Sequence, residues 1–173
     1  MDQLIYGILD RFGSVMRKLG TSIDIHIIHK DGRDELREGV KAGVFTGEKL
    51  PEIVISDDDC GKTFFQIYLA PKTTNGYKGR VLVGETNDDY RFGFNTFKYS
   101  VLGLLPTDVI EALSSGFFEG EIHCEGVELN ASRKSFSRND SLTGFCICIE
   151  QWFREHGLDY YEQLQDKSNE RRL

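Results

Sequence analysis

The sequence predicts an α+β (mixed α/β) domain, built as a two-layer sandwich of a sheet and helices. Three observations carry this expectation. The chain has 173 residues, which fits one domain. It is 39% hydrophobic and 12% aromatic, so it has enough apolar side chains to bury a core. Segments with the two-residue period of strands alternate with segments of helical period, and such chains pack helices against a sheet.

The first predicted element is a helix over 2–19, because its apolar residues recur every three or four positions. Gly20 is a natural helix terminator. The alternating segment 22–29 predicts a strand, and the Lys-Asp-Gly sequence at 30–32 has turn chemistry. The charged segment 33–50 shows no clear period, so we expect a loop there with at most one short helix.

The middle of the chain is dominated by strand-like patterns. Four of them are clear, at 52–56, 63–70, 80–85 and 116–124, and 91–102 is an aromatic, β-prone stretch. Asn75-Gly76 signals a turn between the second and third strands. Pro106 suits the first turn of a helix over 106–115.

The last predicted element is a long helix that Asn139 or Asp140 caps and Gly157 ends. Its apolar positions are Leu142, Phe145, Cys146, Ile149, Trp152 and Phe153. Residues after Gly157 add a short helix and a charged tail. We therefore expect three parts: a leading helix over 1–20 that links from a preceding domain, an α/β domain over 21–157, and the short helix with its tail over 158–173.

Composition and charge exclude several classes of protein. The chain carries 21 basic and 28 acidic residues, a net charge of −7, so we expect no direct nucleic-acid binding. We expect no signal peptide, because no basic leader precedes the N-terminal apolar stretch. The chain has no run of eighteen apolar residues, so we expect a cytoplasmic protein without a membrane partner. The four cysteines are expected to be reduced thiols that pack as small hydrophobes, and their spacing predicts no metal site.

One polar segment stands out, because it joins the strand over 116–124 to the last helix. It presents Asn130, Ser132 and Arg133, with Lys134 close by. A guanidinium on a rigidly supported loop suits phosphate binding, since it offers fixed, charge-assisted donors. On residue chemistry alone, a loop arginine is more often an ordinary surface charge.

The segment from Gly120 to Arg133, GEIHCEGVELNASR, resembles the middle-domain motif of the heat-shock-protein-ninety chaperones. There a strand reading Gly-Val-Val-Asp runs without gaps into Leu-Pro-Leu-Asn-x-Ser-Arg. The residues that match in register are Gly120, Glu125, Leu129, Asn130, Ser132 and Arg133. This chain has Glu128 in place of the proline, and Ser137 where the chaperones have a glutamine. The segment 9–27 resembles the helix-to-strand entry of the related GHKL ATPases, a group that includes gyrase B and MutL.

The resemblance implies a transducer, or middle, domain with a ribosomal-protein-like βαβ fold. Its partner would be an N-terminal GHKL ATPase domain, in cis or in trans, and the full protein would be a candidate homodimer. ATP and Mg would lie on that partner domain, so we expect no cofactor, no metal and no activity in this chain alone. Arg133 would act as the catalytic residue by contacting the γ-phosphate. The residues that would support its loop are Asn130, Ser132, Lys134 and Ser137.

Two other interpretations stay open. The chain would be a self-contained protein-interaction domain with no nucleotide role if exposed aromatic residues, such as Tyr77, Tyr90 and Tyr99, form a contact surface. It would be a standalone hydrolase if Glu119 and Glu121, which share one face of a strand, act as an acid–base pair. A solvent-facing strand edge explains these two carboxylates equally well.

Overall fold

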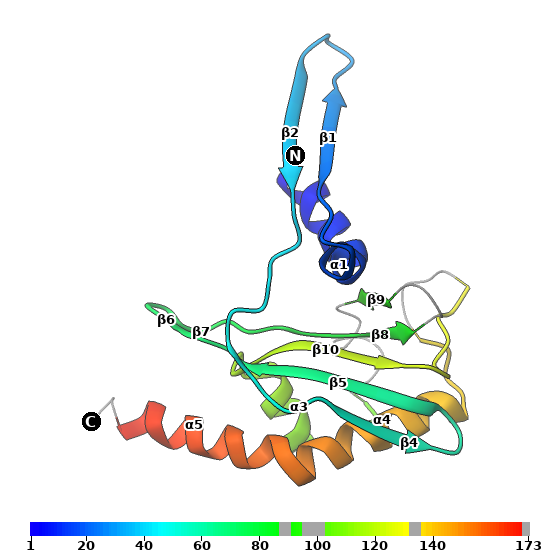
Figure 1. Ribbon diagram of the computed structural model, residues 1–173, viewed down its shortest axis with the longest axis vertical. Helices are drawn as coiled ribbons and strands as arrows, with labels where there is room; N and C mark the ends of the chain where they lie inside the picture. The colour runs from blue at the N-terminus through cyan, green and yellow to red at the C-terminus, as the bar shows by residue number, and fades with distance from the viewer. Residues whose placement is uncertain (87–90, 95–102, 132–135, 171–173) are drawn as a thin grey trace.

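The computed structural model describes residues 1–86, 91–94, 103–131 and 136–170, and its architecture is α+β, as the sequence predicts. A six-stranded sheet carries helices on one face and a projecting arm on the other (Figure 1). The ribosomal-protein-like topology and the division of the chain at residues 20 and 157 stay predictions.

The sheet has the strand order β3-β5-β10-β8-β9, and β4 pairs with the opposite end of β5 from β3. The strands are β3 (Glu48–Lys49), β4 (Ile53–Asp57), β5 (Gly61–Leu69), β8 (Val81–Thr86), β9 (Arg91–Phe94) and β10 (Phe118–Cys124). β10 runs antiparallel to β5 and parallel to β8, and the other pairs are antiparallel. Since β10 lies between two strands, both of its edges are hydrogen-bonded. A separate ribbon of β6 (Lys72–Thr73) and β7 (Gly76–Tyr77) contains the predicted Asn75-Gly76 turn.

The helical layer consists of α3 (Thr107–Ser114), α4 (Asp140–Trp152), the π-helical turn η1 (Phe153–Gly157) and α5 (Leu158–Glu170). These helices lie below the sheet in Figure 1. The core fills the space between the two layers, and its largest fully buried side chains are Trp152, Phe65, Phe118, Phe145 and Phe153. The sequence therefore predicts the docking of the last helix correctly, since its apolar stripe is the face that is buried.

Asn139 caps α4 as predicted, because its side-chain oxygen accepts a hydrogen bond from the Leu142 amide at 3.1 Å. The expected end at Gly157 is wrong, since the helix passes through η1 and continues as α5. Gly157 serves packing instead. A Cβ there would lie 2.5 Å from the Phe153 ring and 2.7 Å from the Trp152 ring, so only glycine lets the two rings sit against the helix.

The arm consists of α1 (Asp2–Leu19) and a hairpin of β1 (Ile23–Ile28) and β2 (Asp34–Val40), and the hairpin projects away from the sheet (Figure 1). Gly20 ends α1 in the left-handed conformation (φ 63°), as predicted. The loop expected over 33–50 is wrong, because β2 and β3 lie there. Nearly all of β2 is exposed, so it has no apolar alternation by which a strand is recognised; its register comes from pairing with β1.

All four cysteines are free and buried, which agrees with the expectation of reduced thiols. Cys60 Sγ lies 4.0 Å from Cys148 Sγ, and the Cys124 thiol donates to the Cys60 carbonyl at 3.4 Å. Burial raises the pKa of Cys146 to about 12 and also raises the pKa of Cys60 and Cys148. These thiols therefore stay protonated at neutral pH and make poor nucleophiles.

We expect none of the four thiols to react with Ellman's reagent while the protein is folded, and all four to react in guanidinium chloride. Burial protects all four thiols, and the raised pKa of Cys60, Cys146 and Cys148 protects these three further. An Asn75→Cys variant, which places a thiol on the exposed turn between β6 and β7, is the matched control and should react at once. Stoichiometric reaction of a native cysteine in the folded protein would contradict the prediction.

Candidate functional site

The segment that resembles the chaperone motif runs from β10 towards the start of α4, and both ends of its loop are held in place. Gly126 donates its N–H to the Cys60 carbonyl at 2.9 Å, and a Cβ there would lie 2.5 Å from that oxygen. Beyond it, Leu129 and Phe136 form an antiparallel bridge that closes the loop. The bridge is anchored by the buried Phe136 ring, which packs edge-on against Phe145 of α4 at 6.0 Å.

The predicted site residues fall partly outside the described ranges. Ser132, Arg133 and Lys134 lie in 132–135, so the structure leaves their predicted roles untested. Asn130 is partly buried and has an interaction partner. The Ser137 amide donates to the Glu128 carbonyl at 2.8 Å, which ties the returning end of the loop to its outgoing end.

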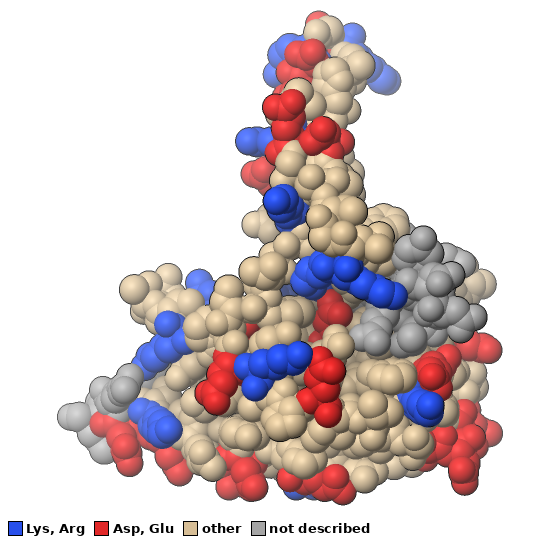
Figure 2. All heavy atoms as spheres, viewed as in Figure 1, with Lys and Arg blue, Asp and Glu red and all other residues tan. Residues whose placement is uncertain are grey.

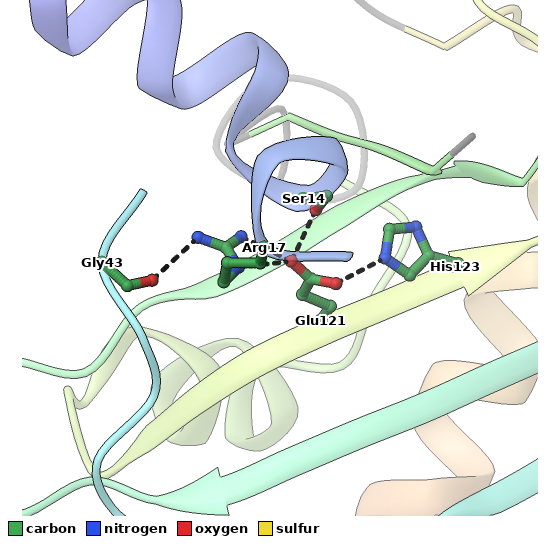
Figure 3. A network of polar contacts seen from close by, with 5 residues as sticks. All are labelled: Ser14, Arg17, Gly43, Glu121 and His123. Carbon is green, nitrogen blue, oxygen red and sulfur yellow. Dashed lines mark hydrogen bonds and ion pairs between the residues drawn. The ribbon is translucent and has the colours of Figure 1, made fainter. Parts of the chain in front are cut away.

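A second polar constellation, which the sequence did not reveal, joins α1 to the centre of the sheet (Figure 3). Glu121 Oε1 accepts a hydrogen bond from Ser14 Oγ at 2.5 Å and two from Arg17, from Nε at 3.1 Å and Nη2 at 2.5 Å. Arg17 also donates to the Gly43 carbonyl at 3.2 Å. On the other side, Glu121 Oε2 contacts His123 Nε2 at 3.1 Å. We call Ser14, Arg17, Glu121 and His123 the clasp.

The clasp is buried, and its burial and hydrogen bonds together set the pKa of Glu121. Glu121 is 7% exposed and His123 is fully buried. Burial by itself raises the pKa of Glu121, but the hydrogen bond and charge of His123, with the hydrogen bonds from Ser14 and Arg17, outweigh it and lower the pKa to about 2. Glu121 is therefore ionised at neutral pH. Within the described part of the chain, His123 Nδ1 has no hydrogen-bond partner.

A pocket of about 480 Å³ opens beside the clasp, in the hollow between the arm and the sheet that Figure 2 shows. Its floor includes Gln66 and Tyr68 of β5, and its walls include Phe45 and Arg17. The Arg17 guanidinium lies 4.7 Å from the centre of the Phe45 ring, and that ring lies 5.3 Å from the Tyr68 ring. Gly43 and Phe45, which lie in the connecting segment between β2 and β3, thus hold Arg17 in place on a second side.

The structure changes the interpretation of Glu119 and Glu121. They do share a face of β10, but β10 is an interior strand, so the solvent-facing strand edge is wrong for Glu121. Glu119 Oε1 accepts the backbone N–H groups of Thr46 and Gly47 at 2.8 and 2.7 Å. Both carboxylates are committed to holding the arm and its connecting segment, and an ionised, fully bonded Glu121 cannot act as a general acid at neutral pH.

The aromatic surface proposed for an interaction domain is only partly described. Tyr77 is partly buried rather than exposed, because its ring packs edge-on against Phe117 at 4.7 Å. Tyr90 and Tyr99 lie outside the described residues. Acidic and basic side chains are interspersed over the arm and the body in the face that Figure 2 shows.

Sequence reasoning missed Ser14 and Arg17 for a physical reason. They lie on the polar side of α1, which a periodicity argument assigns to solvent, and their partner Glu121 is more than a hundred residues away. The available signal was indirect: a glutamate and a histidine two residues apart on one face of a central strand require buried partners.

Comparison with known proteins adds no family: no family model matches the chain, and no curated protein matches it. Among the described residues, no helix is both long and apolar enough to cross a membrane. Among those residues, no group of three or more His, Cys, Asp or Glu side chains is arranged so that it could hold a metal ion.

Proposed function

We propose that this chain is the transducer, or middle, domain of a GHKL-type ATPase. In this function it lies against a separate N-terminal domain that binds ATP and Mg, and it presents Arg133 to the γ-phosphate. Hydrolysis is then coupled to movement of the transducer relative to its partner. The single observation that carries the proposal is the register of the segment from Gly120 to Arg133 with the chaperone motif.

The surroundings of the loop support this assignment. Catalytic stabilisation of charge is largest when the donor is already in place, without reorganisation in the transition state. The loop that carries Arg133 leaves an interior strand, is closed by the bridge between Leu129 and Phe136, and enters the capped end of α4 at Asn139. A frame of this kind suits an arginine that has to be positioned against a phosphate held by another domain.

The test is steady-state ATP turnover by the native ATPase that contains this chain or assembles with it. Arg133→Ala should lower turnover at least about tenfold, a barrier change of roughly 1.4 kcal/mol, because arginine contributions to phosphoryl transfer reach about 10³ to 10⁵. Arg133→Lys should not restore activity fully, since lysine keeps the charge but lacks the planar fork. Circular dichroism should show an intact fold in both variants.

Arg138→Ala is the matched control, because Arg138 is an exposed arginine at the start of α4 that lies outside the motif. It should change turnover much less. Calorimetry on this chain alone should show no tight ATP binding, since the nucleotide pocket is assigned to the partner domain. Equal turnover of wild type and Arg133→Ala would contradict the proposal, and so would micromolar ATP affinity of the isolated chain.

The alternative, a protein-interaction domain without a nucleotide role, has one structural observation in its favour. The arm projects from the body, and large apolar side chains on α1 stay exposed, among them Leu4, Tyr6, Phe12 and Leu19. Exposed apolar side chains gathered on one element are typical of contact surfaces.

A further inference from the structure

Five apolar residues of α1 form a regular seam that the described part of the chain leaves partly exposed. Ile5, Ile8, Phe12, Val15 and Leu19 follow one another at alternating spacings of three and four residues. This is the spacing of the a and d positions of a coiled coil, which lie in a line along one side of a helix. We call these five residues the α1 seam.

The buried side of α1 is a different one. It consists of Gly13, Ser14, Met16 and Arg17, of which the first three are buried. Two of these residues hold α1 down through the polar contacts of the clasp. The helix is therefore attached to the body by one side, largely through polar groups, and presents the seam on another.

Two members of the seam expose much of their apolar surface to water. Phe12 is 43% and Leu19 is 55% exposed, and the other three members are partly exposed. Among the described residues, no member of the seam belongs to the hydrophobic core or packs against it. Covering such side chains with a partner helix removes apolar surface from water, which favours association.

We propose that the occupant of the seam is α1 of a second copy of this chain, in an antiparallel pair. The spacing is self-complementary in this orientation. In a pair centred on residue 10, Ile8 lies opposite the second copy's Phe12 and Ile5 opposite the second copy's Val15. Leu19 lies opposite the second copy's Met1, so every layer pairs apolar side chains. A twofold axis then relates the two copies.

Charge supports the antiparallel orientation. The first turn of α1 contains Asp2, whereas the last turn contains Lys18, beside Arg17, whose charge is paired with Glu121. Antiparallel pairing brings the acidic end of each helix to the basic end of the other and opposes the two helix dipoles, whereas parallel pairing would place like ends together. The 18-residue helix is about 27 Å long, which gives a small interface, so we expect a reversible dimer with micromolar affinity.

The first test is sedimentation velocity on the full chain between about 1 and 200 µM. Wild type should shift from monomer to dimer, and the double variant Phe12→Glu with Leu19→Glu should dimerise at least about tenfold more weakly. The control is Tyr6→Glu, which introduces the same charge at an exposed position of the same helix outside the seam and should leave dimerisation unchanged. Circular dichroism checks that each variant folds. A wild type that stays monomeric, or a seam variant that dimerises as wild type does, would overturn the proposal.

The second test fixes the orientation with engineered disulfides, using Ile8→Cys and Phe12→Cys as separate variants. The native cysteines are buried, so they should not interfere. Antiparallel pairing predicts that an oxidised mixture of the two variants gives mainly the mixed disulfide between residues 8 and 12. Disulfides between identical variants would show parallel pairing and contradict the proposed orientation. The tests measure association alone, so their outcome is independent of whether Arg133 acts in an ATPase.

Discussion

Trp152→Ala should lower the free energy of unfolding by about 3–5 kcal/mol, the usual cost of removing a large aromatic side chain from a core. Trp152 is 1% exposed and lies at the junction of α4 and η1. Its ring stacks on Phe65 of β5 at 5.7 Å and meets Phe118 of β10 edge-on at 6.2 Å. The substitution would leave a cavity bordered by two central strands, which cannot collapse without disturbing the sheet.

Urea or guanidinium melts at neutral pH measure this loss. Ile147→Ala is the matched control, because Ile147 is an apolar residue of the same helix that is 52% exposed, and it should change stability by less than about 0.5 kcal/mol. A loss under about 1 kcal/mol for Trp152→Ala would mean that the surrounding side chains refill the site.

Glu121→Gln should lower the free energy of unfolding by about 3 kcal/mol at pH 7, the typical cost of breaking one partner out of a buried charged network. The substitution keeps the size of the side chain but removes its charge. It also turns one oxygen into an N–H₂ group, which would face a donor of Arg17 or His123. Glu162→Gln, on an exposed position of α5, is the control and should have little effect.

The same carboxylate predicts how stability depends on pH. Its pKa is about 2 in the folded protein and 4.5 ordinarily, so its contribution is fully present above pH 4.5 and is lost as pH falls towards 2. The difference of about 2.5 pKa units corresponds to about 3 kcal/mol. Wild type and Glu121→Gln should therefore converge in stability near pH 2, as urea melts across this range would show. Curves that stay parallel through the range would contradict this role of Glu121. Hydrogen exchange in α1 would show whether the loss is local to the arm.

The helices were the most predictable part of the molecule, because their apolar periodicity and caps are local. The start of α4 at Asn139 and the end of α1 at Gly20 were both read from neighbouring residues. The end of the last helix could not be predicted in this way. Gly157 leaves room for the rings of Trp152 and Phe153, and this close packing arises only when the helix docks on the sheet.

The candidate site also has one part that the sequence predicted and one part that only the structure revealed. The loop that carries Arg133 was found from a contiguous segment, and the tertiary structure adds how its two ends are held, by the bridge between Leu129 and Phe136. The clasp was not found, because its members are polar residues of two segments that are distant in the sequence.

The sequence by itself determined the fold class, most of the strands and the faces of the last helix, since each depends on residues within a few positions of one another. Only the tertiary structure decided that β2 pairs with β1 in an exposed hairpin, that Glu121 lies on an interior strand, and that α1 meets the sheet by its polar side. The physical reason is that burial is a property of the assembled layers. A carboxylate is kept in a core when donors from elsewhere in the chain meet it there, and an apolar stripe stays exposed when a helix is held by its other side.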